Sequence, residues 1–349
     1  MTEVDSRDAC RLLYNSLIQD ESDGVLLRAR VQAAARRLGF VETDRENMTL
    51  AAAEMASNQL KHAHRRGLVQ VWQQPGQTLD LVALDFGGGI DDPVQAAQDG
   101  FSTAHTLGKG LGSIARLSHE WGLYTQPRAP GPPRWHGTLV WARFRAVHAP
   151  KERLGQPHVR VGLFSRSLAD DRYNGDRVYL KIDGQRLAWI HLDGLGHGLE
   201  AQETTDGLAS AVALGVAPQR LLRQVDQTLA SRRGAVGVAV TLDLARGSAC
   251  LAGVGDMSAQ IHSDESVSSL GFAPGILGKE HEEPVVADIA CRRQCTIITA
   301  SDGIRNRSVA GEFPGLVHQH PQVVAYLLGN VMGRATDDQS VCVATARAA

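Results

Sequence analysis

Hydrophobic and polar positions follow two different periods in the first 150 residues, and each period predicts one type of element. Strands are expected at 11–18, 69–73, 78–85 and 137–147, with helices from Ser22 to Gly39, from Thr43 to His64 and over 110–121. Thr43 stands three residues before Glu46, which fits a capping box at the start of the second helix. Helices gathered on one face of a mixed sheet predict an α/β sandwich.

Strand-like runs dominate the second half of the chain, and helical stretches interrupt them. Strands are expected at 158–165, 177–182, 187–192, 235–243, 249–255, 259–262, 295–300 and 340–346, and helices over 199–214, 218–232 and 321–332. This order predicts two sheets flanked by helices, which is an α-β-β-α sandwich. The fold class expected for the whole chain is therefore α+β, with the α/β sandwich first.

The length and two proline-rich breaks predict two domains. A chain of 349 residues suits two domains of roughly 100–200 residues each. The break at 127–133 lies before a predicted strand and is expected to be a loop inside the first domain. The break at 149–157 is expected to be the linker, which gives domains of 1–148 and 158–349.

Charge and composition exclude several classes of protein. The formal net charge of −2 argues against nucleic acid or an anionic membrane as a partner. No apolar run reaches the ~20 residues of a membrane span, and the N-terminus does not resemble a signal peptide. Five scattered cysteines suit reduced thiols in a cytosol. We therefore expect a soluble, cytoplasmic protein.

Three features of the first domain suit a nucleotide. Glu54 and Asn58 share one helix face, where an amide oxygen could bind the Mg²⁺ of ATP and a carboxylate could accept a proton from an attacking hydroxyl. Asp85 ends a predicted strand and could accept a hydrogen bond from the amino group of adenine. Glycines let backbone N–H groups approach phosphates, and they stand here at Gly87, Gly89, Gly108, Gly110 and Gly112, with Lys109 among them.

These motifs resemble the GHKL ATPase superfamily and, within it, the RsbT-type switch serine kinases of bacterial partner-switching systems. The likeness covers about residues 10–147 and includes Gln98–Thr103 before the second glycine cluster. It implies that Asn58 binds Mg²⁺ with ATP, that Glu54 is the catalytic base and that Asp85 contacts adenine. Gly87, Gly89 and 108–112 would form the nucleotide loops.

Acidic residues follow or precede predicted strands in the second domain. Asp193 opens the segment Asp193-Gly-Leu-Gly-His-Gly198, Asp176 precedes a strand, Asp302 follows one, and Asp337-Asp338 precedes the last. Gathering such charges is costly unless cations neutralise them. Oxygen ligands favour Mg²⁺ or Mn²⁺, and two such ions could activate a water to attack a phosphate ester. His197 fits a structural role better than that of a catalytic acid.

This acidic pattern resembles the metal-dependent PPM phosphatases, specifically their SpoIIE and RsbX branch, over about Val159 to Ala346. The resemblance implies that the catalytic Asp193 bridges two ions and that Gly194 supplies its carbonyl. Asp176 would bind the first ion, and Asp302 and Asp337 the second. Asp337 is preferred to Asp338 because it stands three residues before Ser340, as in the family. Gly253–Asp256 also matches the family, and Asp256 is interpreted as structural.

Together the two resemblances predict a bifunctional regulator in a stress-response pathway. The phosphatase half would act on phosphoserine or phosphothreonine of a STAS-domain antagonist protein or similar phosphoprotein, within a pathway that controls a sigma factor. The first half could phosphorylate the same partner. Alternatively, it is a non-catalytic, ATP-dependent platform that binds an anti-sigma partner. A weaker alternative makes the phosphatase half an inert scaffold.

Overall fold

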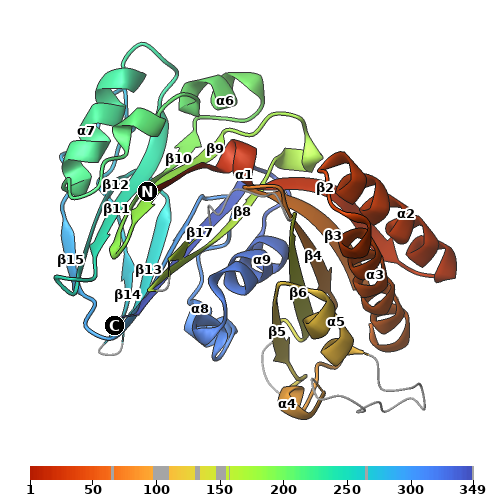
Figure 1. Ribbon diagram of the computed structural model, residues 1–349. Helices are drawn as coiled ribbons and strands as arrows, with labels where there is room; N and C mark the ends of the chain where they lie inside the picture. Colours follow the sequence, from red (N-terminus) through yellow and green to blue (C-terminus); the bar gives the residue numbers. More distant parts are fainter. Residues whose placement is uncertain are drawn as a thin grey trace. The chain divides into compact units, whose positions relative to one another are not determined.

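The computed structural model describes residues 1–63, 67–96, 110–129, 134–146, 155–156, 158–263 and 266–347. It divides into two compact units, Arg11–Glu152 and a larger unit formed by Met1–Cys10 together with Arg153–Ala349 (Figure 1). The sequence led us to expect residues 1–148 in one domain. The first ten residues instead group with the larger unit, because Thr2–Asp5 forms strand β1 of one of its sheets.

Five antiparallel strands form the sheet of the smaller unit, in the order β2-β3-β4-β6-β5. They are β2 (Arg11–Ile18), β3 (Gly67–Gln74), β4 (Thr78–Leu84), β5 (Glu120–Gln126) and β6 (Gly137–Arg145). The helices are α2 (Glu21–Arg37), α3 (Glu42–His62), α4 (Pro93–Ala96) and α5 (Leu111–Leu117). Side chains such as Leu27, Met48 and Leu81 join α2, α3 and the sheet in one core. The predicted α/β sandwich is confirmed.

Local details of the smaller unit differ from the sequence predictions. Helix α3 begins after Val41 without a side-chain cap, so the expected capping box at Thr43 is wrong; Thr43 already lies inside the helix. The capping box is instead on α2, where Asp20 and Asp23 exchange side-chain and backbone hydrogen bonds. The helix expected over 110–121 ends at Leu117, and the chain turns into strand β5.

A buried ion pair crosses the centre of this sheet. Asp80 and Arg143 lie directly opposite each other on β4 and β6. The guanidinium of Arg143 donates to both carboxylate oxygens of Asp80, and each hydrogen bond is 2.7 Å long. The Asp80 side chain is 0% exposed and that of Arg143 is 4% exposed. Such two-pronged pairing satisfies both charges in a position where either alone would be costly.

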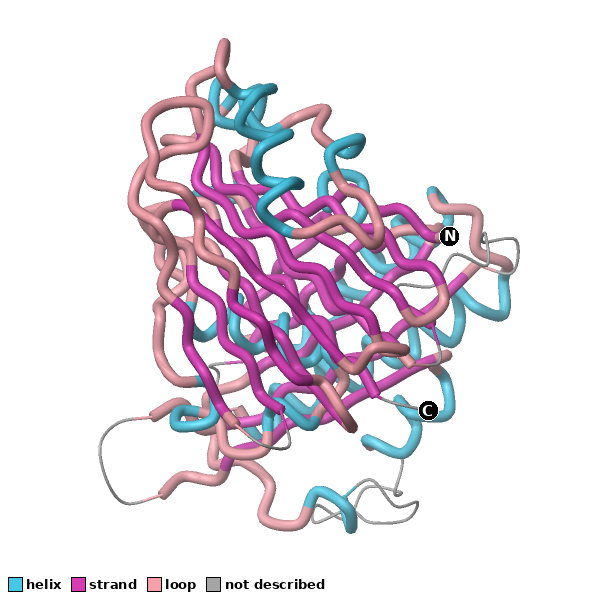
Figure 2. The backbone as a smooth tube through the Cα atoms, turned by 90° about the vertical axis from the view of Figure 1, so that its left-hand side faces the viewer, coloured by secondary structure: helices cyan, strands magenta, loops and turns pink. Residues whose placement is uncertain are grey.

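The larger unit has two six-stranded antiparallel sheets (Figure 2). The first sheet consists, in spatial order, of β1 (Thr2–Asp5), β9 (Asp176–Asp183), β10 (Arg186–Gly194), β11 (Ala235–Asp243), β12 (Ser248–Val254) and β15 (Ala287–Ala290). The second is β14 (Val267–Leu270), β13 (Ser258–Ser263), β16 (Gln294–Ala300), β17 (Gln339–Arg347), β8 (Val159–Arg166) and β7 (Gly155–Gln156).

Helices cover both sheets of this unit. They are α1 (Ser6–Ala9), α6 (Leu199–Thr205), α7 (Pro218–Leu229), α8 (Val309–Glu312) and α9 (Pro321–Met332), with 3-10 turns at Leu168–Asp170, Ala209–Ala211 and Leu316–His318. Helix α7 packs on β11 and β12, whereas α9 packs on β8 and β17. The predicted α-β-β-α sandwich, and with it the α+β fold class, is confirmed. The helix expected over 199–214 ends at Thr205, shortly before Gly207 with its φ of 77°.

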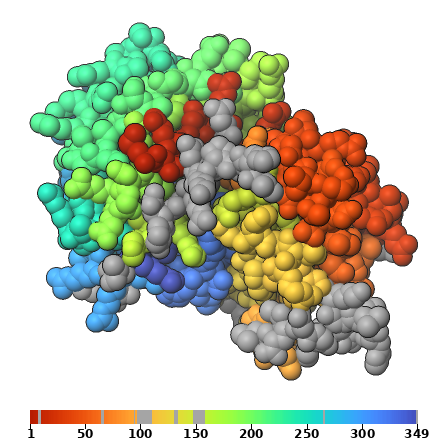
Figure 3. Space-filling model, in the orientation of Figure 1, coloured from red at the N-terminus to blue at the C-terminus, as the bar shows by residue number. Residues whose placement is uncertain are grey.

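The N-terminal residues lie on the surface of the larger unit, where Figure 3 shows their dark red atoms against green ones. Among the described residues, no helix combines the length and apolar character needed to cross a bilayer.

Candidate metal centre and nucleotide site

Two of the predicted acidic residues are cross-strand neighbours. Asp193, near the end of β10, lies directly opposite Asp176, the first residue of β9. Opposed residues of an antiparallel pair project from the same face of the sheet, and like charges in this position repel. Asp176 is 1% exposed, whereas Asp193 is half-buried. The edge of the first sheet therefore presents two carboxylates to one site.

The other predicted carboxylates reach the same site from the second sheet. Asp302 follows β16 and Asp337 precedes β17, and both line a cavity of about 540 Å³ together with Asp193. Asp256, which follows β12, lines this cavity too. Asp256 was interpreted as structural from the sequence, although it shares with Asp302 a position just after a strand.

Each carboxylate of the cavity disfavours ionisation of its neighbours. The pKa of Asp193 is raised well above its usual value, first by burial and then by the negative charges of Asp176, Asp302, Asp337 and Asp256. Burial also raises the pKa of Asp302, with further increases from Asp337 and Asp256. This mutual repulsion makes the cavity a region of strongly negative potential.

Asp176 carries the clearest sign of an incomplete environment. Burial raises its pKa to about 7; the hydroxyls of Ser301 and Ser340 oppose this rise, and the charges of Asp338 and Asp337 add to it. Its Oδ2 accepts a hydrogen bond from Ser340, but its buried Oδ1 has no hydrogen-bond partner among the described residues. A buried carboxylate oxygen of this kind is suited to a cation.

The two adjacent aspartates before β17 have different surroundings. Asp337 lines the acidic cavity. Asp338 is 2% exposed and accepts backbone N–H hydrogen bonds of 2.7 Å from Leu168 and from Gly175. Asp338 also borders a second cavity of about 320 Å³, whose wall includes His197. Asp338 therefore fastens a loop to the start of β9, while Asp337 faces the acidic site.

The side chains at this site fit hard divalent ions, because they are all carboxylates. Gly194, whose carbonyl was predicted as a further ligand, is buried next to Asp193 at the end of β10. Across the ranges that the structure describes, no three His, Cys, Asp or Glu side chains converge closely enough to qualify as a metal-binding group. The carboxylates are thus neighbours around one cavity rather than a tightly gathered ligand set.

A chain of buried polar groups leads from the core to Asp176. The indole N–H of Trp189 donates to Thr299 over 3.2 Å, and Thr299 lies 2.9 Å from Nδ1 of His191. Nε2 of His191 lies 2.7 Å from the Ser340 hydroxyl, which donates to Asp176 over 2.6 Å. Burial lowers the pKa of His191 to about 3, so the ring is neutral.

The groups at the two ends of this chain, Trp189 and Asp176, determine which atom donates in each hydrogen bond. An indole can only donate, and the single hydrogen of Ser340 is used on Asp176. His191 must therefore donate from Nε2 to Ser340 and accept at Nδ1 from Thr299. This chain of hydrogen bonds was not predictable from the sequence, because only the pairing of strands within both sheets brings its members together.

The smaller unit places three predicted nucleotide residues on two neighbouring elements. Glu54 and Asn58 are half-buried on α3, one turn apart. Asp85 follows β4, is 7% exposed and accepts N–H hydrogen bonds at Oδ1 from Gly87 (2.7 Å) and Thr138 (3.2 Å). Burial raises the pKa of Asp85, although these two N–H groups and the nearby His62 and His136 oppose the rise.

The glycines of the first nucleotide loop are required by close packing. A Cβ on Gly87 would lie 2.6 Å from the carbonyl of His62, at the end of α3. Gly89 has a φ of 76°, and a Cβ there would lie 2.6 Å from the carbonyl of Gln126. Gly110 precedes α5 and Gly112 is buried within it. Gly108 and Lys109 lie outside the described residues.

The sequence matches a family model described as a histidine kinase-like ATPase domain over residues 20–143. It is 36% identical over 108 residues to the serine/threonine-protein kinase RsbT of Bacillus subtilis, a stretch that covers 30% of this chain and 81% of RsbT.

Two solved structures resemble the chain more distantly. Magnesium-bound RsbX is 16% identical with a TM-score of 0.49, covering 55% of this chain and 97% of its own. The PP2C phosphatase domain of SpoIIE from Bacillus subtilis, with a fragment of its regulatory domain, is 16% identical with a TM-score of 0.46, covering 94% of each chain. At these TM-scores the likenesses assign no activity.

Proposed function

Because this chain belongs, through residues 20–143, to the histidine kinase-like ATPase family, we propose that it is a partner-switching regulator with an added phosphatase domain. The ATP-binding domain would extend to residue 148, and 149–157 would link it to a phosphatase domain of 158–349 that also includes the first ten residues. The substrate would be a phosphoserine or phosphothreonine on a STAS-domain antagonist protein, in a stress pathway that controls a sigma factor.

The shared acidic cavity is the observation that carries the phosphatase proposal. Asp193, Asp302 and Asp337 line it, and Asp176 lies opposite Asp193 with one unpartnered oxygen. Asp193 would bind both of two Mg²⁺ or Mn²⁺ ions. Asp176 and the Gly194 carbonyl would bind the first ion, and Asp302 and Asp337 would bind the second.

Ions held there would supply a water of lowered pKa and neutralise the phosphate. The protein's own part is to orient Asp176, since the Ser340 hydroxyl donates to one of its oxygens and leaves the other for an ion. The cavity volume of about 540 Å³ admits a phosphorylated side chain.

Hydrolysis of p-nitrophenyl phosphate tests this proposal. The wild-type chain should be active with Mn²⁺ or Mg²⁺ and inactive after chelation, and Asp193→Asn should lose at least 100-fold in rate while it retains its fold. Asp171→Asn is a matched control, because Asp171 lies outside the acidic cavity. Full activity in Asp193→Asn would reject the metal assignment.

The geometry of the smaller unit supports ATP binding and phosphate transfer. Among the described residues, Oδ2 of Asp85 accepts no hydrogen bond, so it could accept one from the amino group of adenine. Asn58 would complete the coordination of Mg²⁺ on ATP, and Glu54 on the same helix face would accept the proton of the attacking serine hydroxyl. Gly87, Gly89 and 108–112, with Lys109, would surround the phosphates.

Transfer of labelled phosphate from ATP to a STAS-domain protein tests the kinase half. Wild type should label the protein, and Glu54→Gln should reduce the rate by about 100-fold or more with ATP binding retained. Binding of the partner without any transfer by wild type would instead support an ATP-dependent binding platform.

A further inference from the structure

The first ten residues complete the sheet that carries Asp176. Strand β1 pairs with β9 in antiparallel register, with Asp5 opposite Tyr179. Just beyond β1, the buried Ser6 hydroxyl accepts the backbone N–H of Val178 over 2.9 Å. The segment therefore covers the outer edge of β9, two residues from the acidic site.

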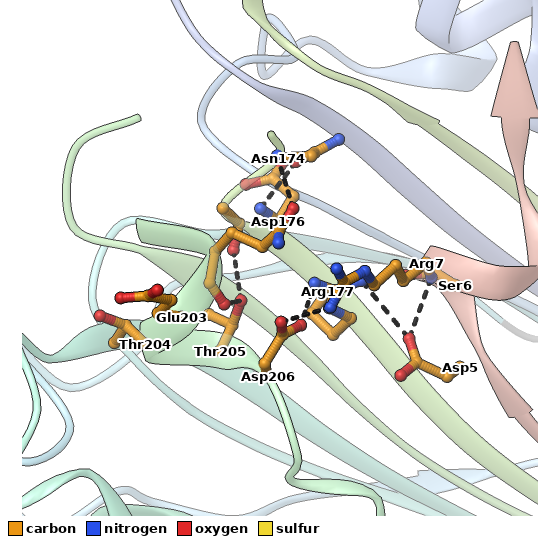
Figure 4. Close-up of polar contacts among 12 residues, drawn as sticks. Asp5, Ser6, Arg7, Asn174, Asp176, Arg177, Glu203, Thr204, Thr205 and Asp206 are labelled. Carbon is orange, nitrogen blue, oxygen red and sulfur yellow. Dashed lines mark hydrogen bonds and ion pairs between the residues drawn. The ribbon is translucent and has the colours of Figure 1, made fainter. Parts of the chain in front are cut away.

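A buried cation depends on carboxylates from two parts of the chain. Arg177 is 2% exposed, and its guanidinium contacts Asp206 and, over 3.6 Å, Asp5 (Figure 4). Arg7 binds the other oxygen of Asp206. Removing one partner of such a buried pair is costly, because the remaining charge stays desolvated. The N-terminal segment thus supplies both a carboxylate for Arg177 and a second cation for Asp206.

The same cluster fastens the end of α6 to the start of β9. Asp206 caps α6, and the neighbouring Thr205 donates its hydroxyl to the carbonyl of Gly175 over 2.9 Å. Tyr179 donates to the carbonyl of Thr205 over 2.8 Å. Because α6 follows the Asp193–Gly198 loop directly, these bonds join both segments from which Asp176 and Asp193 come.

The segment continues without a spacer into the ATP-binding unit. Cys10 still belongs to the larger unit, where its thiol lies 3.5 Å from the carbonyl of Leu163. The next residue, Arg11, begins β2, the edge strand of the smaller unit's sheet. The boundary between the two units thus falls on the Cys10–Arg11 peptide bond, directly after this segment.

We propose that residues 1–10 are a positioning segment for the acidic site, which sets the affinity of that site for divalent ions. This inference rests on the proposed phosphatase function and adds the residues that position its predicted metal ligands. Ser6 and Arg7 act through β9 and Asp206, on the placement of Asp176.

The positioning role is tested by calorimetric titration of the full chain with Mn²⁺ and, over the same concentrations, by hydrolysis of p-nitrophenyl phosphate. The calorimetric affinity should change in parallel with the Mn²⁺ requirement of the rate. The double variant Ser6→Ala/Arg7→Ala should need about tenfold more Mn²⁺ for half-maximal rate and recover most of its rate at saturation. Arg7→Lys should retain most of the wild-type affinity. Glu3→Ala is the matched control, since Glu3 forms an ion pair with Lys181 farther along β9.

If the double variant loses the same fraction of the hydrolysis rate at every Mn²⁺ concentration, these residues contribute only to stability, and the proposal is overturned. Absence of metal-dependent hydrolysis from wild type would reject the phosphatase function itself.

Discussion

Ser340 on β17 donates a hydrogen bond of 2.6 Å to Asp176 on β9, although 164 residues separate them in the chain. The bond joins the two sheets at the acidic site and engages only one oxygen of Asp176. Because His191 in turn donates to Ser340, the hydroxyl has little freedom to rotate away. The second sheet therefore controls the orientation of a carboxylate that belongs to the first.

Replacing Ser340 should weaken metal binding more than folding. Ser340→Ala leaves Oδ2 of Asp176 and Nε2 of His191 without their partner, so the Mn²⁺ concentration for half-maximal hydrolysis should rise about 10-fold or more. Ser340→Thr keeps the hydroxyl and is the control. Equal Mn²⁺ requirements in the Ala and Thr variants would show that this hydrogen bond does not position Asp176.

His191 should stay neutral over the whole physiological pH range. Burial lowers its pKa to about 3, and the hydrogen-bond chain places its proton on Nε2. Imidazole ¹⁵N shifts should therefore report the Nε2–H form, without titration, from pH 8 to pH 5. Since the unfolded chain does take up this proton near pH 6.5, His191 should also reduce stability as the pH falls below that value. A titration of the folded ring near pH 6 contradicts the chain of hydrogen bonds.

Protons and metal ions should compete for the acidic cavity. Burial and mutual repulsion raise the pKa values of Asp193 and Asp302, and that of Asp176 to about 7. Bound metal must displace these protons, so Mn²⁺ affinity should fall as the pH is lowered from 7.5 to 5.5. Calorimetry in buffers of different ionisation enthalpy should detect proton release on binding at pH 6.5. Affinity independent of pH would argue that the ion binds elsewhere.

The glycine loop of the nucleotide site should tolerate a methyl group at one position and not at the next. Gly89→Ala places a Cβ at a φ of 76° and against the carbonyl of Gln126, which should cost on the order of 1–3 kcal/mol and weaken binding of a fluorescent ATP analogue. Gly88→Ala is the control, because its Cβ would meet no atom within 4 Å. Identical nucleotide affinities for both variants would contradict the predicted role of this loop.

Elements with strong local signals were predictable from the sequence. Strand β2 has the predicted bounds, Arg11–Ile18, and helix α9 has the predicted bounds, Pro321–Met332, where proline at the first turn and a glycine after the end mark both limits. The helix predicted over 110–121 ran past the end of α5 into the start of strand β5, which was not predicted, because the short apolar run around Trp121 fits either period.

Features that depend on distant pairing were not predictable. Strand β1 has only four residues, and its partner β9 lies more than 170 residues later in the chain. The position of Asp176 opposite Asp193 likewise required the register of β9 and β10. The sequence indicated acidic residues at strand ends, but only the pairing of strands places Asp256 on the cavity wall and turns Asp338 away from it.

Crystals grown with Mn²⁺, with data collected at the manganese absorption edge, test the central claim most directly. We expect two anomalous peaks roughly 3.5–4 Å apart, with Asp193 bound to both and with Asp176, Asp302 and Asp337 as further ligands. In Asp193→Asn crystals both peaks should disappear or weaken strongly. Manganese bound away from these four carboxylates, at a concentration that supports hydrolysis, would contradict the account.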